Sequence, residues 1–453
     1  MAVKPKIVTL TNSSVDVLNA IRNSATINYR NYVPVATDDP EVIRAIGQTI
    51  MDNPMLQNEF LTSLVNRIGK VIISSKLYSN PWAVFKKGML EFGEVIEDIF
   101  VELAKVQDYD PNVAETEVFK REIPDVRSTF YVLNYQKLYK ATIQERDLRK
   151  AFLSIDGVTN LIAKIVEAIY TSANYDEFLT MKYLIARRLL QGLIFPKDIS
   201  SIGTMHDLAA TFKSVSNEIE FLGTKYNLAG VHTHSLKKEQ HLIINAEVDA
   251  NMDVMVLATA FNMDKAEFLG HRHLVDGFGE LDLDRLDELF KDDPNYVKPS
   301  TAELTALNSI PAILVDEDFF VIVDNLLEFT EQYNGQGLYW NYFYHTWKTF
   351  AVSPFANAIV FVPATPSVTS VTVTPSTATA GAGDVVRLSV AVVTANYAPQ
   401  SVDWSSSDET VATVDKDGVV TISADATAGD TATITATSSF DNTKTDTCVI
   451  TVA

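Results

Sequence analysis

The sequence predicts an α+β body over residues 1–364 and a smaller all-β sandwich over residues 365–453. The composition changes near residue 364. Long helical patterns, strands and nearly all aromatic residues precede it, whereas Thr, Val, Ala, Ser and Asp dominate after it. Pro363 and Pro366 bracket the junction, and prolines make a stiff, non-helical linker. A chain of 453 residues has room for about three domains, so we expect the body itself to be divided.

The charge balance and the cysteine count limit the function classes. The chain has 58 acidic and 37 basic residues, a formal net charge of −21. This argues against a protein that grips phosphates through clustered Lys and Arg. Cys448 is the one cysteine, so an intrachain disulfide and a thiolate metal cage are excluded. Residues 1–12 contain only a short apolar run, and no stretch approaches 18 uninterrupted apolar residues. We therefore expect no secretory signal, no membrane insertion and a cytosolic start.

The N-terminal part of the body contains an amphipathic helix. Asn53 and Pro54 are typical of an N-cap and a first helical residue. Apolar residues that include Phe60 and Leu64 then recur at helical spacing and form one face. This face predicts either core packing within the chain or an arm helix docked on a neighbouring subunit, and the sequence leaves both open.

Residues 71–142 are predicted to be extended. Residues 71–78 and 130–139 are rich in strand formers, with Lys86, Lys87 and the acidic stretch 91–98 between them. One long hairpin with inserted material would explain this pattern. Such a hairpin cannot bury both of its own faces, so it needs a neighbour.

Residues 157–193 give the strongest helical signal. Apolar residues recur every three or four positions without an intervening proline, and Gly157 and Gly192 flank the segment. A continuous helix would be about 50 Å long, which is longer than a compact domain requires and indicates a spine. A break near residues 172–174 is the alternative.

Residues 194–364 are predicted to mix helices and strands. We expect strands at 241–248 and 358–362, a short helix at 254–261, and a hairpin of 312–315 with 319–323. An aromatic cluster at 339–350 could stack bases or sugars. Because Lys348 is its one basic residue and its large rings fall on one helical face, core or interface packing is the better interpretation.

The C-terminal segment shows period-2 alternation typical of strands. It recurs at residues 370–374, 386–392, 411–414 and 431–437, with Gly- and Asp-containing turns between them. Trp404 is the expected core anchor. The segments Val402–Asp408, Val411–Asp415, Gly418–Thr421 and Ala432–Thr437 resemble the bacterial immunoglobulin-like group 2 domain. The Asp415–Gly418 segment could bind calcium, but a hairpin turn is the favoured interpretation.

The sequence contains little that predicts catalysis. The phosphate-loop, zincin and nucleophile-elbow motifs are absent, so we predict no enzyme, no catalytic residues and no cofactor. Five histidines raise the question of a metal: His232, His234, His241, His271 and His273. No convincing closed ligand set surrounds them, so loop or surface positions are expected. Residues 282–287 resemble a calcium loop only superficially, and an acidic amphipathic segment is preferred.

Seven segments spread over most of the body share the pattern of one family. They are Val17–Ser24, Tyr32–Thr37, Gln57–Gly69, Ala260–Met263, Phe268–Gly270, Gly337–Trp347 and Phe355–Phe361. They resemble the major capsid proteins of tailed bacteriophages, and the nearest group is the short-tailed phages of the phi-twenty-nine type. A C-terminal immunoglobulin-like domain fits that group.

The resemblance implies the tailed-phage and herpesvirus type of capsid fold. It implies an N-terminal arm at residues 1–66 and an extended loop at 67–142, both reaching across neighbouring subunits. A peripheral domain carries the spine helix at 157–193. An axial domain occupies about 195–330, and the chain returns to the peripheral domain at 331–362.

The same resemblance implies assembly rather than turnover. Copies of the chain would form pentamers and hexamers of an icosahedral or prolate shell around double-stranded DNA, without reading its sequence. A scaffolding protein and a portal protein are the other implied partners, and the virion, assembled in the host bacterial cytoplasm, is the implied location. We expect Lys86 and Lys87 to meet acidic residues of a neighbour. The immunoglobulin-like domain would lie outside, binding host glycans or stabilising the shell.

Two other function classes remain open from the sequence. A bacterial surface adhesin often carries this type of immunoglobulin-like domain, but the expected lack of a signal sequence argues against it. A carbohydrate-active enzyme with an accessory β-domain would need a catalytic carboxylate pair. The sequence contains no motif that singles out two of its acidic residues as such a pair.

Overall fold

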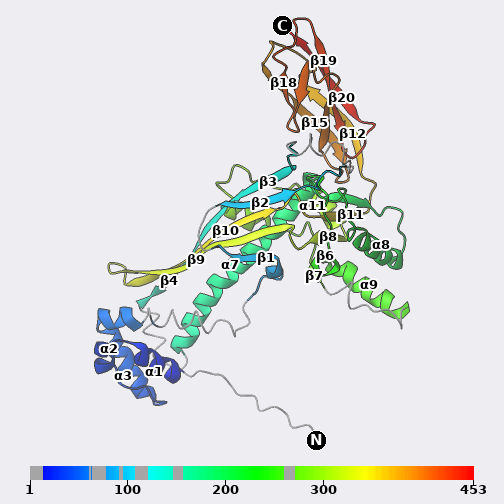
Figure 1. Ribbon diagram of the computed structural model, residues 1–453. Coiled ribbons are helices and arrows are strands. Elements are labelled where there is room, and N and C mark those ends of the chain that lie inside the picture. The colour runs from blue at the N-terminus through cyan, green and yellow to red at the C-terminus, as the bar shows by residue number, and fades with distance from the viewer. Residues whose placement is uncertain are drawn as a thin grey trace.

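The computed structural model describes residues 14–60, 63, 78–90, 95–107, 121–145, 157–259 and 271–453. Figure 1 shows an elongated body from which a β-domain projects at one end, with the N-terminal helices at the other end. The body ends with a strand at Ala358–Val362, and the first strand of the projecting domain begins at Ser367. The boundary expected near residue 364 therefore falls between two strands.

Short helices form the N-terminal cluster. They are α1 (Ser14–Ser24), α2 (Ile27–Tyr32), α3 (Pro40–Met51) and the helical residues 54–60. The Thr26 and Asp39 side chains accept hydrogen bonds from backbone N–H groups and cap α2 and α3. Their apolar faces share one core with Ile143 and Trp340 from the strands of the body, so this cluster packs on the distal end of the body.

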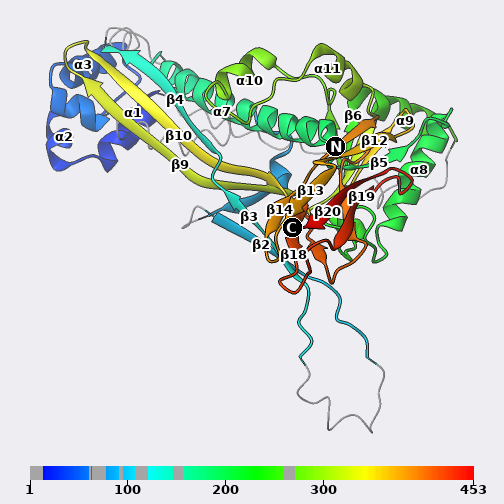
Figure 2. The same cartoon turned by 90° about the horizontal axis from the view of Figure 1, so that it is seen from above.

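The long helix α7 (Gly157–Leu190) spans 34 residues, which is about 51 Å at 1.5 Å per residue. It confirms the long helix predicted at residues 157–193, and it continues through residues 172–174 without a break. Figure 2 shows α7 running along the body from the N-terminal helices toward the other end. Its C-terminal half is buried against both sheets of the body.

The first sheet of the body has the strand order β1-β9-β10-β4. The strands are β1 (Lys86–Met89), β9 (Phe320–Asn334), β10 (Tyr339–Val352) and β4 (Tyr135–Gln144). The aromatic cluster at 339–350 thus lies on a strand rather than on a helix. Its packing role is confirmed, because Trp340, Tyr342, Tyr344 and Phe350 are buried. Alternation along a strand buries every second ring, which helical spacing does not describe.

The second sheet has the strand order β5-β11-β8-β6-β7. Its strands are β5 (Phe195–Asp198), β11 (Ala358–Val362), β8 (Ala312–Asp316), β6 (Gln240–Asn245) and β7 (Arg272–Val275). The helices α8 (Met205–Glu218), α9 (Ala246–Thr259), α10 (Leu283–Leu289) and α11 (Thr301–Asn308) and the 3₁₀ turn η3 (Lys237–Glu239) complete this part. The expected hairpin of residues 312–323 is wrong: β8 pairs with β6 and β11, whereas β9 joins the first sheet. The strand expected at 241–248 ends at Asn245, where α9 follows directly.

A separate hairpin of β2 (Val95–Val101) and β3 (Val126–Val132) lies beside the first sheet. The described parts of its connection, residues 102–107 and 121–125, run away from the body (Figure 2). Within the described residues, the part of the predicted 67–142 loop that lies outside the sheets of the body is limited to β2, β3 and their connection. The 3₁₀ turn η2 (Ala83–Phe85), β1 and β4 belong to the body, whereas residues 71–77 lie outside the described residues.

The projecting domain is a β-sandwich. Its strands are β12 (Ser367–Thr374), β13 (Thr377–Ala380), β14 (Val385–Arg387), β15 (Ser389–Ala395), β16 (Val402–Ser406), β17 (Ala412–Val414), β18 (Val419–Ile422), β19 (Thr431–Ser438) and β20 (Thr445–Val452). Valine, isoleucine and alanine side chains and Cys448 form its core. Trp404 packs on this core but remains partly exposed because β16 is a sheet edge. The Asp415–Gly418 segment is the predicted hairpin turn, and the Asp415 carboxylate accepts from the Val419 N–H.

Among the described residues, no helix combines the length and the hydrophobicity needed to cross a membrane.

Gly418 closes the turn between β17 and β18 underneath Trp404. Its φ is +73°, and an added Cβ would lie 2.9 Å from Trp404 Cζ2 and 3.0 Å from the Leu388 carbonyl oxygen. Gly418→Ala should therefore lower the free energy of unfolding of the β-sandwich by about 2–4 kcal/mol, through backbone strain and overpacking. Gly383→Ala is the matched control, because φ is +82° there and nothing lies within 4 Å. Thermal unfolding checks this, and equal losses in the two variants would contradict it.

Candidate assembly interface

The β2–β3 hairpin has two different faces. One face is anchored to the body: Phe100 stacks on Phe355 with ring centroids 5.6 Å apart, and Arg127 donates to the Ala229 carbonyl at 2.6 Å. The other face points away from the body and is largely apolar. Its side chains, each more than half exposed, are Val95, Ile99, Val101, Val126, Phe130 and Val132. We call these six residues the apolar hairpin face.

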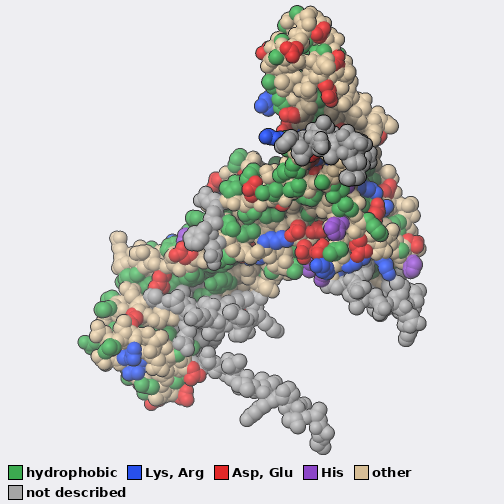
Figure 3. All heavy atoms as spheres, in the orientation of Figure 1, with side chains coloured by type: hydrophobic (Ala, Val, Ile, Leu, Met, Phe, Trp, Pro, Cys, Tyr) green, Lys and Arg blue, Asp and Glu red, His purple; other side chains and the backbone are tan. Residues whose placement is uncertain are grey.

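The cross-strand register brings these residues together on one face. Val95 lies opposite Val132 and Val101 lies opposite Val126, whereas Phe130 lies opposite Glu97 and Ile99 lies opposite Ser128. Neighbours on the same side of a two-stranded sheet are about 4.5–5.5 Å apart, so the six apolar side chains share this face with one carboxylate and one hydroxyl group. Figure 3 shows apolar side chains gathered over this part of the molecule. Contiguous apolar patches of this kind mark interaction sites in soluble proteins.

A buried ion network holds the base of the segment that leads into the hairpin. Lys86 on β1 pairs with Glu177 on α7 at 3.1 Å and with Asp324 on β9 at 2.6 Å. Lys348 on β10 pairs with the same two carboxylates. Asn80 donates to the other oxygen of Glu177 at 2.6 Å. Two lysines and two carboxylates thus compensate each other and tie the spine helix to three strands.

Electrostatics keep this network charged. Burial by itself would raise the pKa of Glu177, but Lys348 and Lys86 more than offset burial and hold the pKa below its usual range. Burial would likewise lower the pKa of Lys86, and the two carboxylates raise it instead. Glu177 and Lys86 are therefore ionised at neutral pH.

These contacts correct one of the interface expectations. The sequence predicted that Lys86 meets acidic residues of a neighbouring subunit, whereas the structure provides both carboxylates within the chain. The reason is that β1 pairs in parallel with β9 inside the body, which places the partly buried Lys86 beside Asp324. Lys87 alternates to the other side, where it pairs with Asp318 at 2.5 Å. Its side chain is 36% exposed, so only Lys87 keeps access to a neighbour.

Phe60 and Leu64 were the two apolar interface candidates in the N-terminal part, and the structure describes only Phe60. Phe60 is fully buried in the core that the N-terminal helices share with Trp340. Its side chain therefore packs within its own chain rather than on a neighbour, because the helical face that carries it is covered by α1 and α3. Leu64 lies outside the described residues.

The β-sandwich is docked on the body by a tight turn. Asn396 and Tyr397 both have positive φ angles, of 55° and 65°. The Asn396 amide donates to the Thr365 carbonyl at 2.8 Å, and Tyr397 packs on the core around the end of α7. An added Cβ at Gly192 would lie 2.6 Å from the Ala398 carbonyl oxygen. The domain is thus held against the body by direct packing as well as by the Pro363–Pro366 linker.

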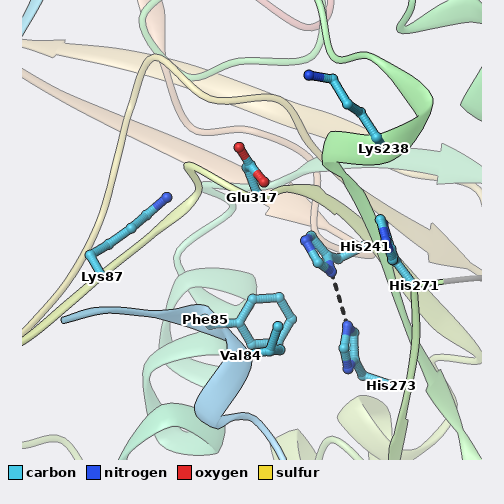
Figure 4. Close-up of a pocket in the computed structure, with 8 residues that line it drawn as sticks. All are labelled: Val84, Phe85, Lys87, Lys238, His241, His271, His273 and Glu317. Atoms are coloured by element: carbon cyan, nitrogen blue, oxygen red, sulfur yellow. Dashed lines mark hydrogen bonds between the residues drawn. The ribbon is translucent and has the colours of Figure 1, made fainter.

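The histidines fall into two places. His232 lies beside the hairpin, where its Nδ1 is 2.6 Å from a Glu102 oxygen. His241, which the sequence placed on a loop or at the surface, is instead buried on β6, next to His271 and His273 (Figure 4). The sequence grouped His241 with His232 and His234, because parallel pairing of β6 with β7 has no local signature.

Sequence reasoning also missed the ion network. One signal was available: Asp176 and Glu177 interrupt the apolar stripe of the spine helix, and charged residues in such a stripe are rarely buried without partners. The identity of those partners was not available, since Lys348 and Glu177 are 171 residues apart.

Comparison with protein families gives two matches that together cover most of the chain. Residues 18–362 match the model of the Phi29-like phage major capsid protein. Residues 367–449 match the bacterial Ig-like domain of group 2. The boundary between the matches coincides with the boundary between body and sandwich.

Individual relatives agree with the family matches. The chain is 38% identical to the major capsid protein of Bacillus phage B103 over 423 residues, which are 91% of this chain and 88% of the relative. It is 35% identical to the major capsid protein of Bacillus phage PZA, with coverage of 90% and 87%. Among solved structures, a chain from the capsid of Staphylococcus phage Andhra aligns with a TM-score of 0.51 at 16% identity. That alignment covers 64% of this chain and 86% of the other, and it supports the predicted fold class.

Proposed function

This chain belongs to the family of Phi29-like phage major capsid proteins, and from that membership we propose that its copies form the pentamers and hexamers of a closed shell. Proteins of this family build the capsid shell, and as capsid proteins they are virion components. The mechanism of this chain is assembly by repeated contacts, and we assign it no catalytic step.

The apolar hairpin face is the observation that carries the proposal. Burying a fully exposed valine, isoleucine or phenylalanine side chain contributes about 1.5–3 kcal/mol. These six are 53–60% exposed, so covering them contributes roughly half of that each, which together can drive association. The opposite face is already packed on the body. A neighbouring subunit is therefore the surface that we expect to cover the hairpin, as the implied role of an extended loop requires.

Such a contact is heterologous, since the hairpin of one copy meets a different surface of the next. Heterologous contacts close into rings when the rotation between copies permits it. Each copy gives and receives this contact, so many modest interfaces add to a stable shell. Lys87 at the base of the hairpin supplies an exposed cation for the same interface.

The family resemblance also implies the divisions of the body and its partners in assembly. The arm comprises residues 1–66, the axial domain about 195–330, and residues 331–362 return to the peripheral domain. Scaffolding and portal proteins complete assembly, which takes place in the host bacterial cytoplasm. The enclosed double-stranded DNA is held without sequence readout. The net charge of −21 suits this role, because an acidic protein repels phosphates and lets the DNA move.

Electron microscopy of the purified protein, alone and with its scaffolding protein, tests the assembly proposal. Closed shells or capsomer-like rings are the expected result. A monomer that stays dispersed under every assembly condition would refute it. The family match over residues 18–362 favours this proposal over an adhesin or a carbohydrate-active enzyme.

We place the Ig-like domain on the outer surface, since a sandwich of this size on the inner side would occupy volume needed for DNA. Its two candidate roles are adhesion to host glycans and stabilisation of the shell. Deleting residues 365–453 separates them. Intact shells with weaker binding to host cells are expected for adhesion, whereas loss of shells or earlier thermal disruption is expected for stabilisation.

A further inference from the structure

The turn between β15 and β16 is a point at which the Ig-like domain meets the body. Tyr397 packs on the core around the C-terminal half of α7. The next residue, Ala398, is fully buried in the core of the sandwich. Two neighbouring residues thus belong to two different hydrophobic cores. Since they share one stretch of backbone, a movement of the turn disturbs the packing of both domains.

The end of the spine helix lies directly against this turn. Gly192 has a φ of +65°, and its N–H donates to the Leu189 carbonyl at 2.9 Å, as is common where a helix ends. An added Cβ at Gly192 would lie 2.6 Å from the Ala398 carbonyl oxygen and 3.3 Å from Pro399 Cα. The helix end and the turn therefore approach each other with no room for a side chain between them.

The turn holds an unfavourable backbone conformation in making this contact. Asn396 and Tyr397 have φ angles of 55° and 65°, which cost free energy for residues other than glycine. The Asn396 amide donates to the Thr365 carbonyl at 2.8 Å and so ties the turn to the linker. Packing of the Tyr397 ring on the body offsets the remaining cost.

The ring of Tyr397 makes this contact, and its hydroxyl group does not. The hydroxyl oxygen is buried and finds no hydrogen-bond partner within the part of the chain that the structure describes. Burial raises the pKa of Tyr397 to about 12, and the carboxylate of Glu303 on α11 is the second cause. The side chain thus reaches into the body toward α11, where its apolar ring supplies the attraction.

A second aromatic contact joins the two domains. Phe440, in the turn between β19 and β20, packs on the sandwich core, and its ring centroid lies 6.2 Å from that of Phe195 on β5. Figure 1 shows the sandwich standing on this end of the body. A linker by itself leaves two domains free to reorient, whereas contacts from two different turns fix one orientation.

We propose that the Ig-like domain is a clamp on the C-terminal end of the spine helix of its own chain, and that Tyr397 is the residue that holds it. Body and sandwich then unfold as one cooperative unit, although they match two separate families. The last turn of a helix opens most easily, and the clamp covers that turn. The clamp acts within one copy, so it is separate from adhesion and from contacts between copies in a shell.

Hydrogen exchange of the purified, unassembled chain tests the clamp. Tyr397→Ala removes the ring from the body, so exchange at the amides of residues 187–193 should become at least about 10-fold faster. The increase should be larger there than in β8, at the centre of the second sheet. Tyr397→Phe keeps the ring and removes a hydroxyl group that lacks a partner, so exchange should stay within about twofold of the unmodified chain. Equal exchange at residues 187–193 in the two variants would overturn the proposal.

Calorimetry supplies an independent readout. The unmodified chain and Tyr397→Phe should each give one thermal transition, and Tyr397→Ala should give two. Two separate transitions in the unmodified chain would contradict the clamp.

Gly192→Ala tests the same contact from the side of the helix, and it serves even if Tyr397→Ala does not fold. The added methyl group displaces the turn, so two transitions are expected. Gly230→Ala is the matched control, because φ is +61° there and nothing lies within 4 Å. It should keep one transition, and identical calorimetric traces of the two glycine variants would refute the clamp. None of these readouts needs shells, so they are independent of the assembly proposal.

Discussion

Replacing Glu177 with glutamine is expected to lower the free energy of unfolding of the unassembled chain by about 3–5 kcal/mol. The substitution removes one of two carboxylates that compensate Lys86 and Lys348. Asp324 alone would then face two cations, the buried Lys348 and Lys86, whose side chain is 21% exposed. An uncompensated buried charge is among the most costly defects that a single substitution can make. Denaturant unfolding followed by circular dichroism measures the loss.

Glu288→Gln is the matched control for this experiment. Glu288 also pairs with a cation, Arg285 at 3.3 Å, but its side chain is 75% exposed. Exposed pairs contribute about 0–1 kcal/mol because water and salt screen them. Equal free energies of unfolding for Glu177→Gln and Glu288→Gln would show that the ion network does not stabilise the fold.

The same network predicts an acid dependence. The pKa of Glu177 in the folded chain is held below its ordinary value, which is about 4.3. A carboxyl group of this kind stabilises the fold above that ordinary value, and the contribution is lost as the pH falls through the lowered pKa. Between about pH 5 and pH 3, the unmodified chain should therefore lose more stability than Glu177→Gln does. Parallel pH profiles of the two proteins would contradict this.

Val132→Lys is expected to prevent shell formation while leaving the folded monomer intact. Val132 is 59% exposed in the apolar hairpin face, so a lysine there costs the isolated chain little. In a contact with a neighbour, the ammonium group would be buried without a partner, which costs several kcal/mol. Every contact between copies in a shell would contain this unpaired charge, so its energetic cost adds up over the whole shell. Electron microscopy and sedimentation under assembly conditions give the readout.

Val393→Lys supplies the control for this substitution. Val393 is a valine of similar exposure, 54%, on β15 of the Ig-like domain. It should assemble like the unmodified chain, and thermal unfolding should show that both monomers are folded. Shells of normal yield and size from Val132→Lys would show that the hairpin face is not an assembly surface.

The hairpin shows which features of the candidate interface the sequence could predict. A hairpin that needs a neighbour was predicted, because two strands cannot bury two faces. Its strands were expected at residues 71–78 and 130–139, whereas the described hairpin pairs residues 95–101 with 126–132. Which face stays free was not predictable. That depends on Phe355 and Ala229, which lie more than 100 residues further along the chain and cover the other face.

Local patterns by themselves determined much of this protein. The repeat of apolar residues predicted the long helix α7, although a break near residues 172–174 stayed open. The period-2 alternation predicted the sandwich, and the Asp415–Gly418 turn followed from its residue types. These features depend on neighbours within a few residues, which the sequence displays directly. The family resemblance extended this to the capsid fold and its function.

Only the tertiary structure decided which distant residues meet. Parallel pairing of β1 with β9 turned Lys86 from an expected interface residue into part of a buried network. Parallel pairing of β6 with β7 joined His241 to His271 and His273. Such pairings depend on how whole elements pack, and the burial of each charge or ring follows from that packing. No local pattern in the sequence specifies these contacts.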